Sequence, residues 1–315
     1  MPNAVIIVFQ PIPSATHNEP MATVDAAPSR WQERALSVPP HAYFVVSAVF
    51  HYLGPAFAVL LFARVDVLGV AWLRIMSAGL VFALWRKPWV AWAGLSSDMR
   101  WTVLWWGVVL AVMNGSFYIS IDRLPLSTVA AIEFVGPIVL AAVGVRSARN
   151  GLALLFAGAG VYVLTGIRLE GEPLGLAFAF VNAALFTLYI VLGHRVAQTG
   201  PAQSIDLLGS SMLIATLVAA PVGILDAGSA LLDPMALLAG AGVGISSSVI
   251  PYVSDQLALG RLARSTYALF VSLLPATATI VGILVLTQIP TATEVAGVAL
   301  VVGGVAVHEE QRAGH

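Results

Sequence analysis

Two charged side chains and two amides lie deep inside segments that are otherwise apolar. These residues are Arg74, Asn114, Glu133 and Asn182. Counted from the nearer end of each segment, at 1.5 Å of helix rise per residue, Arg74 and Glu133 lie roughly 10–12 Å deep and the two amides fall in the same layer. A guanidinium, a carboxylate and two amides at one depth suit the binding of a small zwitterion such as an amino acid.

The two charges have separate expected roles. Arg74 would bind a substrate carboxylate in a bidentate fork. Glu133 would contact the substrate amine or carry a coupling proton, since burial favours the protonated form of a carboxyl group. Charged groups cost about 2.5–3.5 kcal/mol or more in hydrocarbon, which makes both residues functional candidates. The alternative is that Arg74 and Glu133 pair with each other as a buried structural brace.

Five further residues are weaker candidates. His51 titrates near neutral pH and would relay protons, or else pack between helices with a hydrogen bond. Tyr118 and Tyr252 would line a binding cavity, although tyrosines near span ends are often interfacial anchors. Pro137 and Pro275 interrupt apolar segments and would act as hinges that shape the cavity, or as plain kinks.

The composition places this chain in a membrane. Of its 315 residues, 59% are hydrophobic and 10% are charged, and the mean hydropathy is +0.90. The net charge of −1 argues against nucleic acid as a partner. The absence of cysteine excludes disulfides, thiolate metal sites and thiol catalysis. His308, Glu309 and His315 lack the spacing of a zinc protease, so neither a metal nor a cofactor is expected.

A helix needs roughly 20 apolar residues to cross the hydrocarbon core. The sequence predicts an all-α polytopic fold with ten such spans, at 41–62, 67–85, 101–121, 125–145, 150–167, 174–193, 205–225, 235–254, 266–286 and 291–308. Seven tryptophans mostly lie near span ends, where an aromatic belt at the membrane interface is the default interpretation: Trp72, Trp85, Trp89, Trp92, Trp101, Trp105 and Trp106.

The positive charges predict the orientation of the spans. With the N-terminus in the cytoplasm, three basic residues lie outside, namely Arg64, Arg123 and Arg168, and Arg74 lies within a span. The others lie inside: Arg30, Arg34, Arg86, Lys87, Arg100, Arg146, Arg149, Arg195, Arg261, Arg264 and Arg312. Both termini are therefore expected in the cytoplasm.

The chain contains a weak internal repeat. Residues 120–137 align without gaps to residues 258–275, and the pairs Arg123/Arg261 and Pro137/Pro275 are among the identities. This offset makes each half five spans long. Because five is odd, the halves would cross the membrane in opposite senses, which is a common plan among transporters that work by alternating access.

Several short motifs carry a family resemblance. Within residues 108–145 the pairs Met113-Asn114, Phe117-Tyr118, Glu133-Phe134 and Gly136-Pro137 resemble the drug/metabolite transporter superfamily of the EamA type. The likeness covers about 41–308. It implies a ten-helix carrier of the bacterial inner membrane that exports amino acids or related metabolites, threonine or homoserine for example, coupled to proton entry.

These observations predict four segments: a disordered cytoplasmic tail over 1–40, a first five-helix repeat over 41–167, a second over 174–308, and a short cytoplasmic tail over 309–315. No nucleotide-binding motif occurs, so an ion gradient would drive transport. A homodimer is compatible with the sequence. The alternatives are an exporter of a different metabolite or drug, a channel, and a membrane-embedded enzyme acting on lipids, although the scattered aspartates do not form the cluster that such an enzyme needs.

Overall fold

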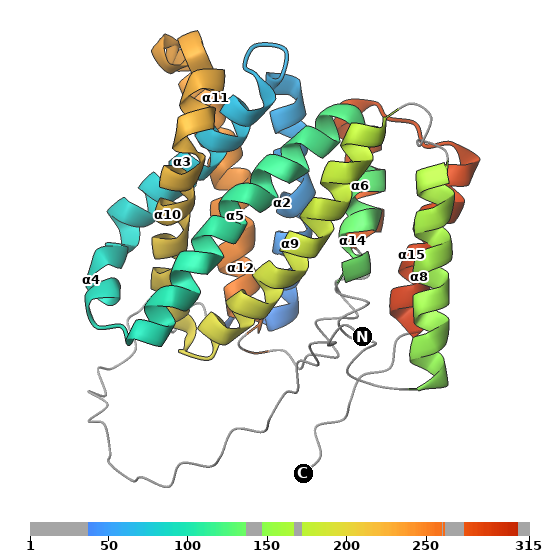
Figure 1. The fold of residues 1–315 in the computed structure, drawn as a ribbon, viewed down its shortest axis with the longest axis horizontal. Helices are drawn as coiled ribbons and strands as arrows, with labels where there is room; N and C mark the ends of the chain where they lie inside the picture. Colours follow the sequence, from blue (N-terminus) through green and yellow to red (C-terminus); the bar gives the residue numbers. More distant parts are fainter. Residues whose placement is uncertain (1–36, 137–146, 167–171, 260, 262–273, 308–315) are drawn as a thin grey trace, which may run out of the picture. The chain divides into compact units, whose positions relative to one another are not determined.

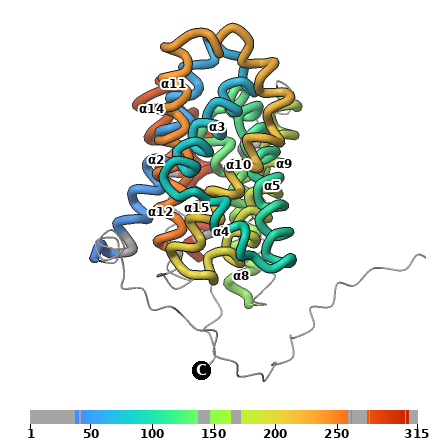
Figure 2. The backbone as a smooth tube through the Cα atoms, turned by 90° about the vertical axis from the view of Figure 1, so that its left-hand side faces the viewer, coloured from blue at the N-terminus to red at the C-terminus, as the bar shows by residue number. Residues whose placement is uncertain are grey.

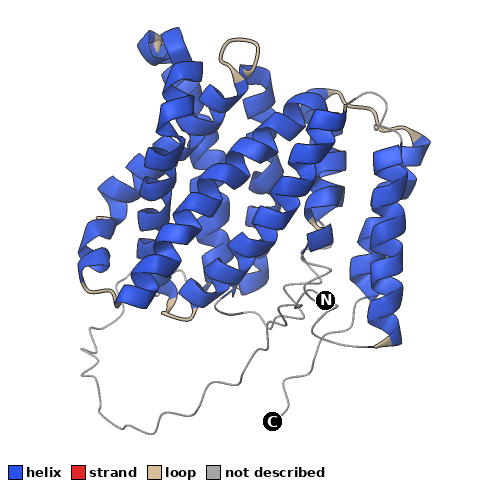
Figure 3. Ribbon diagram, viewed as in Figure 1, coloured by secondary structure: helices blue, strands red, loops and turns tan. Residues whose placement is uncertain are grey.

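In a computed structural model, the described residues are 37–136, 147–166, 172–259, 261 and 274–307. Every regular element within these ranges is a helix, and they contain no strand (Figure 3). The predicted all-α class is therefore confirmed for this part of the chain. The two predicted tails fall almost entirely outside it, as do His308, Glu309 and His315.

Within the described ranges, six helical segments are long and apolar enough to cross a membrane. They are α2 (Pro40–Leu61), α3 (Val67–Arg86), α5 (Ser97–Arg123), α9 (Pro173–Ala197), α10 (Pro201–Ala227) with η1 (Gly228–Leu232), and the continuous run of α11 (Pro234–Gly244), η2 (Ile245–Val249) and α12 (Ile250–Leu259). These six coincide with the first, second, third, sixth, seventh and eighth predicted spans.

Four apolar helices lie in the other predicted spans but are shorter as described. They are α6 (Leu126–Glu133), α8 (Ala148–Gly166), α14 (Leu274–Leu286) and α15 (Ala292–Val307). Residues 137–145 of the predicted fourth span and 266–273 of the predicted ninth span lie outside the described residues. The complete set of ten spans therefore stays a prediction.

Several helices extend beyond the predicted apolar limits. Arg123 ends α5, and Arg195 lies in the last turn of α9. Basic side chains are favourable at a helix C-terminus, because they face the unpaired carbonyls and the negative end of the dipole. A charged residue therefore indicates where the hydrocarbon ends, but the helix can continue past that point. A short helix that the hydropathy pattern did not predict, α4 (Pro88–Ala93), follows α3.

The helices pack in a small set of pairs. α3 runs along α10, α5 along α9 and α8 along α15, while α2 packs against α12 and α14 (Figures 1 and 2). Small residues allow the closest contacts, as expected between membrane helices. A Cβ atom at Gly69 would meet the backbone of Ala227, for example, and one at Gly223 would meet the indole of Trp72.

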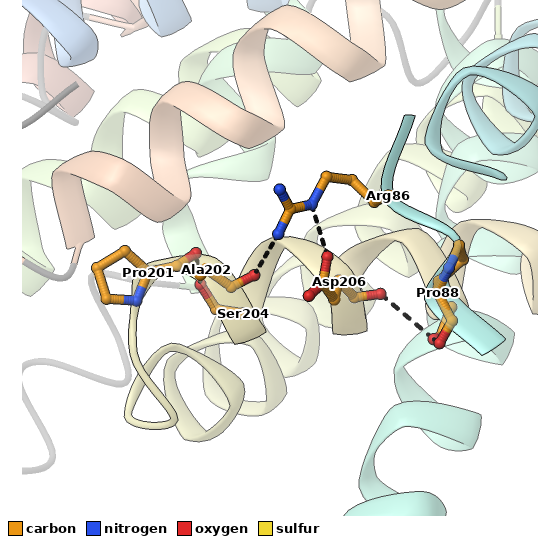
Figure 4. A network of polar contacts seen from close by, with 7 residues as sticks. Arg86, Pro88, Pro201, Ala202, Ser204 and Asp206 are labelled. Carbon is orange, nitrogen blue, oxygen red and sulfur yellow. Dashed lines mark hydrogen bonds and ion pairs between the residues drawn. The ribbon is translucent and has the colours of Figure 1, made fainter. Parts of the chain in front are cut away.

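A polar network ties the end of α3 to the beginning of α10 (Figure 4). Arg86 Nε donates to Asp206 Oδ1 over 2.6 Å, and Arg86 Nη2 donates to the Ala202 carbonyl over 3.4 Å. Ser210 Oγ donates to the Pro88 carbonyl over 3.3 Å. Since α3 and α10 belong to different predicted repeats, this network connects the two halves of the chain.

Two of the tryptophans depart from the expected belt. Trp85, Trp89, Trp101 and Trp105 are exposed, but Trp72 and Trp106 are buried. Trp72 faces α10, where its indole N–H donates to the Thr216 carbonyl over 3.1 Å. Trp106 stacks on Tyr189 of α9, with 5.6 Å between ring centroids. For these two residues the belt prediction was wrong, because each faces a neighbouring helix.

Candidate functional site

Arg74 is held in the core by the eighth predicted span. Its side chain is 4% exposed. Nε donates to Ser248 Oγ over 2.9 Å, and Nη2 donates to the Ser247 carbonyl over 2.8 Å and to the Tyr252 hydroxyl over 3.4 Å. All three acceptors are neutral, so none of them compensates the positive charge of the guanidinium.

The backbone carbonyl that Arg74 uses belongs to a π turn. Residues Ile245–Val249 form η2, a single π-helical segment between α11 and α12. Such turns leave backbone groups away from regular helical pairing and often mark functional sites. Close packing fixes this one: a Cβ atom at Gly54 would collide with the Ser247 side chain, and one at Gly244 would meet the Arg74 carbonyl.

Tyr118 and Asn114 complete the surroundings of Arg74. The guanidinium carbon lies 5.5 Å from the centroid of the Tyr118 ring, which is within cation–π distance. The Tyr118 hydroxyl is fully buried and lies beside Arg74 and Ser247, without a hydrogen bond of standard geometry to either. Asn114 Nδ2 donates to the Leu110 carbonyl over 2.7 Å, and its side chain also lies beside the Tyr252 hydroxyl. Both tyrosines are therefore core residues, not interfacial anchors.

Glu133 is the second charge of the site. It ends α6 and is 3% exposed. Asn182 Nδ2 donates to its Oε1 over 2.9 Å, and the Tyr52 hydroxyl donates to its Oε2 over 3.3 Å. Asn182 is fully buried, and its own Oδ1 has no hydrogen-bond partner among the described residues. The carboxylate thus joins α6 to α2 and α9.

Arg74 and Glu133 interact electrostatically but do not form a salt bridge. The two groups lie close enough to affect one another through space. The ion pairs within the described residues join Arg86 to Asp206, Arg123 to Asp122, and Arg195 to Asp98. The alternative of a buried Arg74–Glu133 brace is therefore not what the structure contains, and each charge has its own neutral partners.

His51 lies between the surroundings of the two charges. Its ring centroid is 5.3 Å from that of Tyr52, which contacts Glu133, and 6.4 Å from that of Tyr252, which contacts Arg74. It is also 6.3 Å from the ring of Phe186. Phe186 in turn stacks on Tyr189, with 6.1 Å between ring centroids, so the aromatic contacts extend from His51 along α9.

Of the two predicted hinge prolines, Pro275 is among the described residues. Pro137 lies outside the described residues. Pro275 is buried at the beginning of α14, and its carbonyl accepts a hydrogen bond from Thr279 Oγ1 over 2.9 Å. This is the usual bond from a threonine hydroxyl to the carbonyl four residues earlier on its own helix.

Three residues of the site were not predicted. Tyr52, Ser247 and Ser248 provide hydrogen bonds to the two charges. Nothing in the run Ser246–Ser248 indicates the π turn that brings Ser247 and Ser248 to Arg74. Tyr52 carried one available signal, since it is a polar group next to His51 in the middle of an apolar segment.

Comparison with known proteins agrees with this architecture. Residues 173–308 match the EamA-like transporter family. The chain is 32% identical to the threonine/homoserine exporter RhtA of Escherichia coli (strain K12) over 239 residues, which is 75% of this chain and 79% of the relative. It is 29% identical to RhtA of Salmonella typhimurium (strain LT2) over 253 residues, or 79% and 84% of the two chains.

A solved crystal structure shares the fold. It aligns with a TM-score of 0.59 at 19% identity and covers 86% of this chain and 98% of the other. At that identity the likeness concerns the fold alone. The apolar helices, the buried charges and the similarity over three quarters of the sequence lead to one conclusion: this chain is a multi-pass membrane protein of the EamA-like transporter family, a transporter and not an enzyme.

Proposed function

We propose that this protein is a secondary active exporter of amino acids or related small metabolites, with threonine and homoserine as the first candidates. The observation that carries the proposal is the presence of Arg74 and Glu133 in one buried region, each with its own neutral partners. Because neither charge neutralises the other, both are available to a ligand that carries the opposite charges. The names of the similar proteins support the choice of candidates.

A zwitterion would bind with its two charges separated. Its carboxylate would replace the Ser247 carbonyl on the Arg74 fork, since a charged acceptor binds a guanidinium more strongly than a neutral one. Its amine would bind Glu133. The unpaired Oδ1 of Asn182 would accept the side-chain hydroxyl that threonine and homoserine share. A site built around a hydroxyl acceptor discriminates well against analogues that lack the hydroxyl.

The coupling ion would be the proton, with Glu133 as its carrier. A carboxyl group in an apolar bundle is less costly to bury when it is protonated. Release of that proton would create the anion that binds the substrate amine, so proton and substrate would occupy Glu133 alternately. His51, which lies beside Tyr52, would relay protons to the carboxylate.

The transport cycle would use two inverted halves, residues 41–167 and 174–308. The helix packing supports this arrangement. If each span of one half has its counterpart five spans later, then α2 against α12 corresponds to α9 against α5, and α2 against α14 corresponds to α9 against α6. Both members of each pair of contacts are present. Motion of one half against the other would expose the Arg74–Glu133 region to the two sides in turn, with Pro137 and Pro275 as hinges.

We place the protein in the bacterial inner membrane with both termini in the cytoplasm. The distribution of basic residues supports this orientation. With it, the Arg86–Asp206 network lies at the inner end of the helices, and the η1 segment at the outer end. The substrate would then leave through the end at which α2 and α10 finish.

Uptake into proteoliposomes with an imposed pH gradient tests the proposal. A panel that includes threonine, homoserine, serine and the hydroxyl-free analogue 2-aminobutyrate identifies the substrate. We expect transport of the first two, strongest with the gradient, and its loss in Glu133→Gln. Asp66→Asn is the control, because Asp66 is exposed between α2 and α3. Equal transport by wild type and Glu133→Gln would disprove the role of Glu133.

A further inference from the structure

A second carboxyl group is buried in the bundle, away from Arg74 and Glu133. Asp255 lies on α12 and is 8% exposed. Ser47 Oγ of α2 donates to its Oδ1 over 2.5 Å. Within the described part of the chain no arginine, lysine or histidine forms an ion pair with it. One neutral hydroxyl is little compensation for a buried negative charge, which normally requires a cation or several donors.

A series of polar groups on α2 and α12 lies between Asp255 and Glu133. Ser47 and His51 are four residues apart on α2, and Tyr252 and Asp255 are three apart on α12, so each pair shares one helix face. The His51 ring lies 6.4 Å from Tyr252 and 5.3 Å from Tyr52. The Tyr52 hydroxyl then donates to Glu133. Each step along this series has a side chain that can accept and give a proton.

Few other charged groups on the helices packed against α12 could affect the protonation of Asp255. α12 packs against α2, η2, α9 and α10. The η2 segment brings only serines as polar groups, and Tyr252 is the titratable neighbour on α12 itself. The titratable or charged side chains described on the other three helices are Tyr43, His51, Tyr52, Tyr189, His194, Arg195, Asp206 and Asp226. Of these, Arg195 pairs with Asp98 and Asp206 pairs with Arg86.

We infer that Asp255 is a second proton-binding site, on the inner side of the Arg74–Glu133 region, that exchanges protons with Glu133 along α2. The inner side follows from its place one turn before the end of α12, ahead of Arg261. This inference rests on the proposed function, because Asp255 would provide the route by which the coupling proton reaches the cytoplasm. It also assigns a role in proton coupling to a buried carboxyl group of the second half of the chain.

The proton transfer balances without any other reactant. Tyr52 takes the proton of the Glu133 carboxyl group and gives up its own hydroxyl proton to one ring nitrogen of His51. The other ring nitrogen of His51 releases a proton toward Asp255, where a new O–H bond forms. Glu133 is then ionised and Asp255 is neutral, and Asp255 returns the proton to the inner solution. Two carboxyl groups thus share one proton in turn.

The competing explanation is that the Ser47–Asp255 bond only braces α2 against α12. The variant Asp255→Asn distinguishes the two explanations, because an amide still accepts the Ser47 hydrogen bond but binds no proton. Two assays are compared in proteoliposomes: accumulation driven by a pH gradient, and exchange of labelled for unlabelled solute. Exchange needs no net proton movement. Asp66→Asn is again the exposed control, and size-exclusion chromatography verifies the folding of each variant.

We expect Asp255→Asn to lower gradient-driven accumulation by about tenfold or more while exchange stays within about twofold of wild type. Ser47→Ala, which keeps the carboxyl group, should retain most of both activities. If Asp255→Asn leaves both activities unchanged, or lowers both together, then Asp255 is not a coupling site.

A chemical probe tests the same inference without a substrate or a variant. Dicyclohexylcarbodiimide adds to protonated carboxyl groups in apolar surroundings and leaves a stable acylurea that mass spectrometry locates. In wild-type membranes at neutral pH we expect the adduct at Asp255 and none at Asp66. Unmodified Asp255 under conditions that label Glu133 would overturn the inference. If wild type transports none of the solutes, the proposed function fails, whereas the labelling still decides whether Asp255 binds a proton.

Discussion

The side-chain amide of Asn182 donates to one oxygen of the Glu133 carboxylate over 2.9 Å, and the hydroxyl of Tyr52 donates to the other over 3.3 Å. These two bonds bring α9 and α2 to the end of α6. A charged residue is thereby fixed by helices from both predicted halves of the chain. Any relative motion of the halves must change at least one of the two contacts.

Removal of the Asn182 amide should weaken transport. Asn182→Ala leaves Glu133 with the longer Tyr52 bond alone, and loss of a buried hydrogen bond to a carboxylate costs about 1–3 kcal/mol. We expect KM for the substrate to rise about tenfold and the thermal unfolding midpoint to fall. Gln198→Ala is the matched control, since Gln198 is an exposed amide at the end of the same helix. An unchanged KM would exclude Asn182 from the binding site.

Arg74 should not be replaceable by lysine. Arg74→Lys keeps the positive charge but loses the planar fork that reaches both the Ser248 hydroxyl and the Ser247 carbonyl. We expect the substrate KM to rise by about tenfold or more, because a single ammonium cannot bind a carboxylate in the same bidentate way. Arg64→Lys, at an exposed position after α2, should have no effect. Equal KM values for the two variants would contradict this prediction.

Gly54 should not tolerate a side chain. In Gly54→Ala the new methyl group would collide with Ser247, which provides the carbonyl for Arg74. Overpacking of this kind costs about 1–3 kcal/mol, so we expect a lower unfolding midpoint together with weaker transport. In Gly158→Ala the methyl group meets nothing within 4 Å, and the higher helix propensity of alanine should leave stability equal or slightly greater.

The ion pair between Arg86 and Asp206 should contribute more to stability than the pair between Arg195 and Asp98. The side chains of the first are 15% and 21% exposed, and those of the second 55% and 74%. A double-mutant cycle by reversible unfolding in mixed micelles should give a coupling of about 1–2 kcal/mol for the first and below about 0.5 kcal/mol for the second. Equal couplings would mean that burial does not strengthen the Arg86–Asp206 ion pair.

The sequence predicted the elements of this fold better than their contacts. Six of the expected spans coincide with long apolar helices, because hydrocarbon thickness imposes a simple length rule. The burial of Arg74 and Glu133 followed from the same rule. Asn182 and Tyr252 were among the predicted site residues and do contact the two charges. Tyr52 and Ser247 could not be predicted, since they approach the charges through packing between segments far apart in the chain.

Asp255 shows where the hydropathy pattern misleads. The eighth span was expected to end at residue 254, which left Asp255 just outside it. Instead α12 continues to Leu259 and buries this carboxyl group against α2. The depth of a charge depends on what packs around the helix at that point, which a pattern along one segment does not record. The tryptophans at 72 and 106 were misplaced for the same reason.

The π turn between α11 and α12 sets the rotational phase of one whole span. A π segment contains one residue more than regular helix over the same turn, and one residue corresponds to about 100° of rotation. Tyr252 and Asp255 therefore face α2 and Arg74 only while that extra residue stays at Ile245–Val249. Deletion of a single residue there would restore a regular helix and turn both side chains away from the site.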